Sequence, residues 1–447
     1  MDIVIKLSQF LLSLSLLIIL HELGHFIPAK LFKTRVEKFY LFFDVKYSLI
    51  KKKIGETEYG IGWLPLGGYV KISGMIDESM DKEQMALPPQ PWEFRSKPAY
   101  QRLIIMLGGV TVNFILAFII YIGMAFAYGD TFIANSDLQD GVLIENQAML
   151  NTGFKTGDKI IALDGEKIAK FDNDFLMKII LAKNVLIERN GNQQEIKMPI
   201  DFIDQLSKFE KNTLVGIRMP FVIAAVSEES ANTALEPKDL VLSLNGQKTK
   251  YYDEVQTILE NNKGKTISAV VLRDQKETTI NVYIDKDGIL GVKTGSLSID
   301  NLEKLGYYKV SKQEFSFMES IPVGVTRGKE QLVGYGKQLK MIFSPSTGAY
   351  KSVGGFKAIF DIFPSSWDWE HFWTITALLS IMLGVMNLLP IPALDGGHVM
   401  FLLYEIISGK KPSDKFLENA QLVGFVILIT LLLFANGNDI YKAIVGK

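Results

Sequence analysis

Four stretches of the sequence are long and apolar enough to cross a lipid bilayer as helices, which takes about 20 mostly apolar residues. They are residues 7–28, 103–127, 372–394 and 419–438, and the last three contain no charged side chain. Buried helices of a soluble protein rarely recur four times at this length, so the pattern predicts a multi-pass α-helical membrane protein. The first stretch also resembles a signal peptide, but no small-x-small cleavage site follows it, and we expect it to stay in the protein.

The segment between the second and third apolar stretches has mixed polarity and contains an internal repeat. The sequence GDKIIALDG at 157–165 recurs as KDLVLSLNG at 238–246. An apolar run precedes each copy, at 142–144 and 221–223, and a helix-like stretch follows each copy. Short apolar runs bounded by Gly, Asn, Asp and Lys are typical of small β-rich domains. We therefore predict two copies of one small domain exposed to water.

Basic residues gather in two of the loops between the apolar stretches. The loop between the third and fourth stretches contains Lys410, Lys411 and Lys415. The loop between the first and second stretches contains a larger group: Lys33, Arg35, Lys38, Lys46, Lys51, Lys52 and Lys53. Because loops rich in Lys and Arg stay on the cytoplasmic side of a membrane, we expect both loops to be cytoplasmic and the repeat and both termini to lie outside.

Composition narrows the chemistry that the chain can perform. Its 48 Lys and Arg residues nearly balance 49 Asp and Glu residues, so a net charge of −1 offers no basic field for nucleic acid. The absence of cysteine excludes disulfides, thiolate nucleophiles and cysteine-ligated metals. Any metal site must therefore use His, Asp and Glu, and only four histidines are available.

The first apolar stretch contains the motif HELGH at 21–25. Positions i and i+4 share one face of a helix, so His21 and His25 can both bind one zinc ion while Glu22 lies beside them. Zinc acidifies water, and a neighbouring carboxylate can accept the proton. Helix rise places His21 roughly 10 Å from the end of the apolar stretch, inside the bilayer on its cytoplasmic side. Ionisable groups at that depth are costly unless paired or ligated, which favours a functional metal site.

Two histidines leave a tetrahedral zinc ion short of a protein ligand, and Asp395 is the charged side chain at comparable depth. Pro390 and Pro392 break the helix before it, and irregular backbone at this depth must line protein or a water-filled cavity. We expect Asp395 to complete the zinc site; the alternative is an interfacial residue that caps the next helix. His398 competes as the third ligand and ranks behind Asp395, and we interpret His371 as an interfacial residue.

The second and third apolar stretches contain one asparagine each, where an unpaired amide is costly. Asn387, two turns before Asp395, is expected to donate a hydrogen bond to a substrate carbonyl or oxyanion. The alternative for Asn387 is a hydrogen bond between helices. Asn113, in the middle of the second stretch, fits a functional role and helix packing equally well.

Apolar and polar residues alternate from 36 to 50 and again from 58 to 72. Four glycines interrupt the second run: Gly60, Gly62, Gly67 and Gly68. This pattern predicts strands or a hairpin near the metal site, with the 58–72 segment offering a strand edge to an extended substrate. The alternative is a plain cytoplasmic hairpin.

Together these features resemble the site-2 protease family of intramembrane zinc metalloproteases, and within it the bacterial RseP group. The similarity covers nearly the whole chain and rests on HELGH at 21–25, LPLGGYVK at 64–71, GGVTVNF at 108–114, two PDZ-like repeats and NLLPIPALDGGH at 387–398. The resemblance implies a multi-pass α-helical membrane protein with four transmembrane helices, a membrane-associated β element and two inserted PDZ-like α+β domains.

The resemblance also implies a role for each motif residue. It makes His21, His25 and Asp395 the ligands of Zn2+, Glu22 the catalytic base, and Asn387 a contact to the substrate near the scissile bond.

In the same family pattern the 58–72 segment is the membrane-associated β element, and we expect Gly67 and Gly68 there to contact substrate. The second repeat departs from the pattern, with Lys238 in place of a glycine. Gly108-Gly109-Val110 stands where the family usually has Gly-Pro.

The resemblance further implies the substrates and the location. The substrates would be single-pass membrane proteins, either an anti-sigma factor or remnants of signal peptides, cut in or near the transmembrane segment. The PDZ-like domains would act as a size filter on the periplasmic side of the bacterial inner membrane, with the active site towards the cytoplasm. We expect the lipid bilayer as a partner and no nucleic acid.

These interpretations predict a definite order of segments along the chain. The predicted segments are a first transmembrane helix with HELGH (1–34), a cytoplasmic loop with the β element (35–100), a second transmembrane helix (101–128), two PDZ-like domains (130–216 and 217–298), a linker with amphipathic membrane-surface helices (299–370), a third transmembrane helix with the Asp395 motif (371–397), a cytoplasmic helix or loop (398–418), a fourth transmembrane helix (419–438) and a tail (439–447). Within the linker, 314–342 is amphipathic and expected to lie along the outer membrane surface.

Two other functions compete with proteolysis. A membrane-tethered PDZ scaffold would carry the metal motif without using it, but a scaffold has no need for Glu22. A transporter would use the intramembrane His and Asp side chains as ion ligands, but four spans without a repeat between their halves disfavour it.

Overall fold

The computed structural model describes residues 2–65, 67–75, 87–171, 173–206, 208–209, 214–295 and 297–445. They form two compact units. The helical unit comprises residues 1–129, 314–343 and 350–447, and the β-rich unit comprises residues 130–313 and 344–349. Leu66, within the LPLGGYVK motif, lies outside the described residues.

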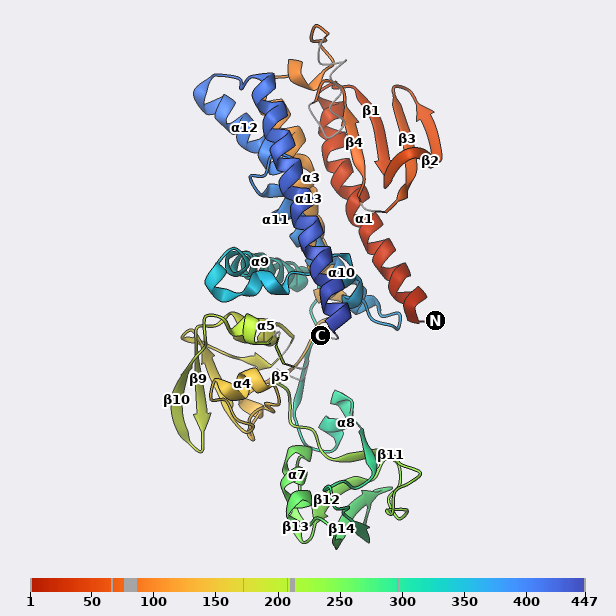
Figure 1. The fold of residues 1–447 in the computed structure, drawn as a ribbon, viewed down its shortest axis with the longest axis vertical. Coiled ribbons are helices and arrows are strands. Elements are labelled where there is room, and N and C mark those ends of the chain that lie inside the picture. The colour runs from red at the N-terminus through yellow and green to blue at the C-terminus, as the bar shows by residue number, and fades with distance from the viewer. Residues whose placement is uncertain are drawn as a thin grey trace. The chain divides into compact units, whose positions relative to one another are not determined.

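Four helices of the helical unit are long and apolar enough to span a membrane, which confirms the predicted number within the described residues. They are α1 (Asp2–Leu31), α3 (Ala99–Tyr128), α11 (Trp369–Leu388) and α13 (Asp414–Val445) (Figure 1). Among its described residues the unit also contains the α-helices α9 (Phe317–Ile342), α10 (Phe356–Ile362) and α12 (Asp395–Ser408).

The apolar stretch 372–394 is not one continuous helix. It is divided because α11 ends at Leu388 and Pro390 and Pro392 follow, each lacking the backbone N–H that helix continuation requires. The chain resumes as α12 at Asp395. The break thus places the Asp395 side chain at the start of a helix instead of in the middle of one.

Small residues bring α1 and α3 into backbone contact. A Cβ atom added to Gly24 would lie 2.4 Å from the carbonyl oxygen of Gly108, so neither helix tolerates a side chain there. A buried hydrogen bond of 2.7 Å from the Ser380 hydroxyl to the Asn113 carbonyl joins α11 to α3. These contacts fix the three helices that carry most of the candidate site.

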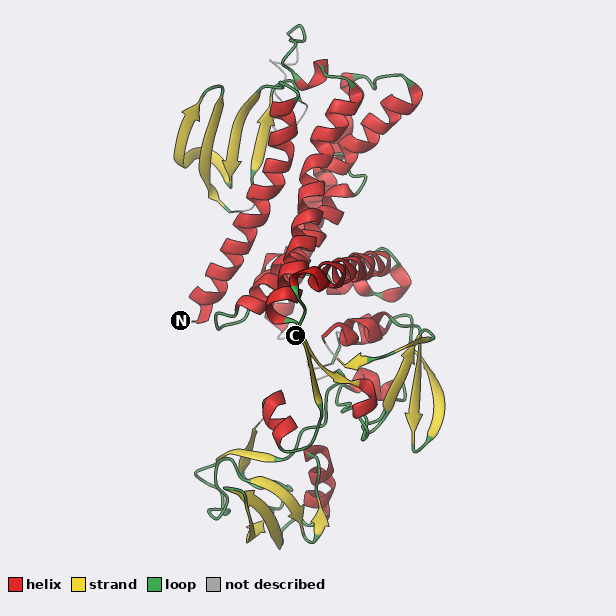
Figure 2. Cartoon of the chain, turned by 180° about the vertical axis from the view of Figure 1, so that it is seen from behind, coloured by secondary structure: helices red, strands yellow, loops and turns green. Residues whose placement is uncertain are grey.

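A four-stranded sheet lies beside α1 (Figures 1 and 2). Its strands are β1 (Val36–Leu41), β2 (Phe43–Ile54), β3 (Thr57–Leu64) and β4 (Tyr69–Ile72), in the order β2-β3-β1-β4. The predicted edge at 58–72 is therefore only partly correct. Strand β3 is paired on both sides, antiparallel to β2 and parallel to β1, because the chain crosses over between β1 and β3. Of this segment only β4 is an edge strand.

The β-rich unit contains three sheets, ordered β10-β9-β6-β7, β15-β14-β12-β11-β16 (with β13 paired to β12) and β17-β5-β8. Its strands are β5 (Asp130–Ala134), β6 (Lys159–Leu163), β7 (Glu166–Lys167), β8 (Lys170–Phe171), β9 (Asn184–Arg189), β10 (Asn192–Lys197), β11 (Val222–Val226), β12 (Leu240–Leu244), β13 (Gln247–Lys248), β14 (Thr266–Arg273), β15 (Lys276–Tyr283), β16 (Val292–Gly295) and β17 (Val310–Gln313). Its helices are α4 (Gln147–Asn151), α5 (Asn173–Leu181), α6 (Phe202–Leu206), α7 (Tyr252–Asn261) and α8 (Ile299–Lys304).

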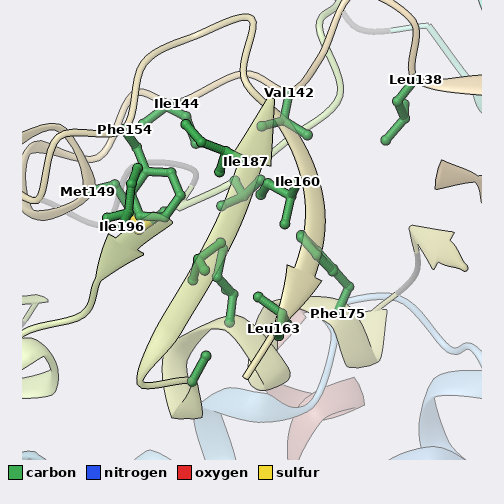
Figure 3. Close-up of a cluster of buried hydrophobic side chains, with 14 of the residues drawn as sticks. Leu138, Val142, Ile144, Met149, Phe154, Ile160, Leu163, Phe175, Ile187 and Ile196 are labelled. Carbon is green, nitrogen blue, oxygen red and sulfur yellow. The ribbon is translucent and has the colours of Figure 1, made fainter. Parts of the chain in front are cut away.

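Two hydrophobic cores form within the β-rich unit, one around each copy of the sequence repeat. The first includes Phe154, Ile160 and Ile187 (Figure 3), and the second includes Ile223 and Val271. Separate cores are what two small domains in tandem require, because each must bury its own apolar side chains.

The two copies of the repeat also share local structure. Each has a strand, β6 or β12, followed by a two-residue turn in which both residues have positive φ. These turns are Asp164-Gly165 and Asn245-Gly246, residue types that tolerate the left-handed conformation. A helix follows each turn, α5 in the first copy and α7 in the second.

Candidate metal centre

Three side chains from two helices converge inside the helical unit. His21 and His25 lie one turn apart on α1, and Asp395 is the first residue of α12. The Nε2 atoms of the two histidines are 3.3 Å apart, and Asp395 Oδ2 lies 3.4 Å from that of His21 and 3.3 Å from that of His25. The predicted ligands therefore meet as a nearly equilateral triangle of potential donor atoms.

The size of this triangle fits tetrahedral zinc. With metal–ligand distances of about 2.0–2.1 Å, neighbouring ligand atoms of a tetrahedral site are about 3.3–3.4 Å apart. Asp395 Oδ2 is buried and forms no hydrogen bond with any residue that the structure describes. A buried carboxylate oxygen is expensive without a partner, and a cation held by the three atoms would supply one.

The outer nitrogens of the two imidazoles are held by α3. His25 Nδ1 donates a hydrogen bond of 2.8 Å to the carbonyl oxygen of Ile105, which leaves the lone pair on Nε2, facing the cluster. Asn113 lies 3.0 Å from His21 Nδ1, and its Oδ1 has no hydrogen-bond partner among the described residues. When His21 Nε2 binds a metal, Nδ1 carries the proton, and a half-turn of the amide lets Oδ1 accept it. The sequence left the role of Asn113 open; the structure places it against His21.

A glycine of α3 lies directly against the two rings. A Cβ atom added to Gly109 would be 2.3 Å from His25 Nε2 and 2.6 Å from a ring carbon of His21. Any side chain at this position would occupy the space between the ligand atoms. The sequence signal for this role was the Gly108-Gly109 pair within an apolar stretch.

The cluster opens into a cavity of about 600 Å³. Glu22 lines it, next to the start of β4, where a Cβ atom added to Gly68 would lie 3.6 Å from Glu22 Cγ and only 2.5 Å from Ile18. Gly67 lines the same wall. The missing side chain of Gly68 thus lets the start of β4 approach α1 beside Glu22, whereas a Cβ atom added to Gly67 would lie 2.9 Å from the ring of Phe43.

Asn387 reaches the cluster from α11. Its amide nitrogen lies 3.3 Å from His21 Nε2, and its side chain lines the cavity. His398 also lines the cavity but is not part of the three-residue group. His371 lies at the start of α11, where it is exposed and 3.0 Å from Asp368, away from the cluster.

A further amide side chain lines the cavity and was missed by the sequence analysis. Gln421 of α13 contributes to the wall and is 4% exposed. The signal that could have found it is the one that identified Asn113 and Asn387, an amide within an apolar stretch.

Comparisons with known proteins agree with this geometry. Residues 9–431 match the profile of Peptidase family M50. Relatives named as candidate zinc metalloproteases include a *Clostridium perfringens* protein, 28% identical over 96% of this chain and 97% of its own, and a *Campylobacter jejuni* protein, 28% identical over 98% and 94%. A PDZ domain of an SdrC-like protein from *Listeria monocytogenes* aligns with 19% of this chain and 90% of its own at 21% identity and a TM-score of 0.16.

The family match spans nearly the whole chain and includes both helices that bring the three donor atoms together. The donor set, the fit of its spacing to zinc and the membrane-capable helices are consistent with that match. The chain belongs to Peptidase family M50 and is a membrane zinc metalloprotease.

Proposed function

We propose that this protein hydrolyses a peptide bond in or near the transmembrane segment of single-pass membrane proteins. The observation that supports this most directly is the His21, His25 and Asp395 triangle beside Glu22, in a cavity lined by membrane-capable helices. A metal site at that depth reaches peptide bonds that a soluble protease cannot reach.

In this proposal His21, His25 and Asp395 hold Zn2+, which when bound polarises a carbonyl group and acidifies water. Glu22 takes a proton from the attacking water and later delivers it to the departing amine, so that water and one peptide bond become a carboxylate and an amine. Asn387 donates a hydrogen bond to the oxygen on which negative charge develops.

The substrate is proposed to bind in an extended form along β4. This edge strand lines the cavity and directly follows Gly67 and Gly68, so an unwound segment that pairs with it lies beside Glu22. Because a helix satisfies its own backbone, pairing with β4 replaces hydrogen bonds that the substrate loses on unwinding.

We further propose that residues 130–216 and 217–298 are two PDZ-like domains that act as a size filter. The twin cores and matching turns support a tandem of one fold. The filter would admit membrane stubs whose outer domains another protease has already trimmed. Deleting residues 135–298 should then let intact, bulky substrates be cut; unchanged resistance of those substrates would end the filter proposal.

The proposed substrates are a single-pass anti-sigma factor or remnants of signal peptides in the bacterial inner membrane. The basic loops at 33–53 and 410–415 support an active site towards the cytoplasm, with the β-rich unit and α9 on the periplasmic side and α9 along the membrane surface.

The decisive experiment is cleavage of a tagged single-pass substrate with a trimmed outer domain by purified protein in detergent. Glu22→Gln should lower the cleavage rate by a factor of roughly 10² to 10⁴ while zinc stays bound, because only the proton-transfer group is lost. Glu166→Gln, an exposed change on β7, is the matched control and should cut like the wild type. Equal cleavage by the wild type and Glu22→Gln would contradict the proposed role of Glu22.

A further inference from the structure

Helix α13 differs from the other membrane-capable helices in how little of it is buried. Only 11% of its most apolar window is buried, compared with 39% for α3 and for α11. One contact with the rest of the helical unit is at Gly424, where an added Cβ atom would lie 2.7 Å from the backbone of Pro392 and Ala393. The close approach at Gly424 brings the preceding turn of α13, with Gln421, to the cavity.

Gln421 is a buried amide on a helix that is mostly exposed. It is 4% exposed and lines the cavity that contains Glu22 and Asp395. The structure gives its side chain no hydrogen-bond partner among the residues that it describes. Two other amides of the membrane-capable helices donate hydrogen bonds to backbone carbonyl oxygens: Gln9 to Pro364 at 2.9 Å and Asn438 to Val353 at 2.6 Å.

The Gln421 side chain lines the cavity wall without a hydrogen-bond partner among the described residues, so a ligand that enters the cavity can bind the amide. A glutamine side chain offers one acceptor oxygen and two donor hydrogens, which complement the N–H and C=O groups of a peptide backbone. The neighbouring cavity residues are suited to the same ligand, because β4 is an edge strand of the sheet formed by the described residues and Asn387 offers a second amide.

An extended peptide has hydrogen-bonding groups on both of its sides. A strand paired with β4 satisfies the groups on one side, whereas those on the other side remain exposed at a depth where water is scarce. We propose that Gln421 binds a main-chain peptide group of the unwound substrate, on the side that β4 does not reach. This inference rests on the proposed function and adds a substrate-binding residue to it.

Recognition of the main chain has a consequence that side-chain recognition lacks. Gln421 should contribute about equally to substrates with different side chains around the cut, because every residue except proline offers both backbone groups. Its contribution should disappear when the contacted peptide group is changed.

The test uses the full-length zinc-loaded protein in detergent and a synthetic single-pass peptide substrate. Gln421→Met keeps the length of the side chain and removes its hydrogen bonds, and we expect kcat/KM to fall roughly tenfold while zinc content and the thermal midpoint stay unchanged. Val423→Met, on the exposed face of the same helix, is the matched control and should keep the wild-type rate.

Ester substitution of single peptide groups in the substrate then separates backbone binding from a structural role. An ester lacks the N–H donor and has a weaker carbonyl acceptor. At one position near the scissile bond, the ester should slow the wild type roughly tenfold and leave Gln421→Met unaffected, because the contact is already lost. Losses that add at every ester position, a wild-type rate for Gln421→Met, or loss of zinc from that variant would each overturn the inference.

The same experiment distinguishes the inference from the function on which it rests. If neither the wild type nor Glu22→Gln cuts the peptide, the proposed function fails and the inference fails with it. If the wild type cuts and Glu22→Gln does not, but Gln421→Met cuts at the wild-type rate, only the inference fails.

Discussion

Buried carboxylate oxygens in the two units differ in whether they accept hydrogen bonds. In the β-rich unit, Asp158 accepts a hydrogen bond of 2.6 Å from Arg189 and one of 2.9 Å from the backbone of Lys155. In the helical unit, Asp395 Oδ2 is equally inaccessible and has no hydrogen-bond partner among the described residues, only two imidazole nitrogens at 3.3–3.4 Å.

The buried acid of the second repeat is hydrogen-bonded in the same way as that of the first. Asp239 accepts 2.7 Å and 2.6 Å hydrogen bonds from Arg273 and a 2.9 Å bond from the backbone of Glu236. The fold thus provides hydrogen bonds to the buried acids of the two repeats and none to Asp395 Oδ2, which is the arrangement expected for a group that binds a cation. Burial alone therefore does not identify a functional acid; the missing partner does.

The largest expected effect comes from removing the unsatisfied acid. Asp395→Ala should abolish zinc binding and with it cleavage, because two histidines hold the metal far more weakly than three ligands. Metal analysis of the purified protein measures the zinc content, which we expect to fall from about one ion per chain to a small fraction. Asp158→Asn should leave zinc in place; if it removed as much zinc as Asp395→Ala does, the distinction between the two acids would fail.

Breaking the satisfied pair in the second repeat should cost stability instead. Removing one partner of a buried ion pair costs about 3 kcal/mol or more, because the other charge stays buried without compensation. Arg273→Met should lower the hydrogen-exchange protection of β12 and β14 by that free energy in the full-length protein. Zinc content and the protection of α1 and α3 should stay unchanged.

Acid should weaken the same pair. Burial alone would raise the pKa of Asp239, but the hydrogen bonds from Arg273 and the Glu236 backbone hold it below its usual range. A pKa that is lower in the folded than in the unfolded state stabilises the fold above the unfolded value, near pH 4, and this contribution is lost as the pH falls towards the folded value. Exchange in the second repeat measured down to pH 3 should show the loss for the wild type and not for Asp239→Asn.

A smaller loss of zinc affinity is expected when the hydrogen bond that orients His21 is removed. Asn113→Leu keeps the volume of the side chain but removes the hydrogen bond to His21, and zinc affinity should fall roughly 10- to 100-fold. A competitive chelator titration measures this. Asn438→Leu removes an amide that bonds the backbone at Lys351 and Val353, and should leave zinc affinity unchanged.

The smallest effect should come from an exposed ion pair of the β-rich unit. Lys250 pairs with Asp140, and the two side chains are 55% and 39% exposed. Lys250→Ala should change the unfolding free energy by less than about 1 kcal/mol, because water screens the pair. A loss of unfolding free energy as large as that caused by Arg273→Met would show that exposure does not predict how much these ion pairs stabilise the fold.

Sequence patterns predicted the placement of residues best where the residues lie close together along the chain. The HELGH spacing identified two donors on one turn of α1, and the proline break before Asp395 marked backbone that had to line a cavity. The repeat was visible because GDKIIALDG and KDLVLSLNG have similar residues at matching positions, and both form a strand followed by the same turn.

Features that depend on packing between distant segments were missed or left open. The parallel pairing of β1 with β3, which leaves β4 as the edge strand of the 58–72 segment, requires a crossover that alternation does not reveal. Likewise, the amides of Asn113 and Gln421 look alike in sequence, yet one lies against His21 and the other lines the cavity. Only the crossing of the helices decides which amide faces which partner.

The separation of His21 and Asp395 along the chain also has a consequence for biosynthesis. His21 and Asp395 lie near opposite ends of the chain, and a ribosome adding about 5–20 residues per second needs roughly 20 to 75 seconds to pass from one to the other. Throughout that interval α1 carries two imidazoles without the carboxylate that completes the triangle. A nascent chain therefore has no complete metal triad until Asp395 has been synthesised, and the insertion machinery around it is not exposed to the proposed protease activity before that point.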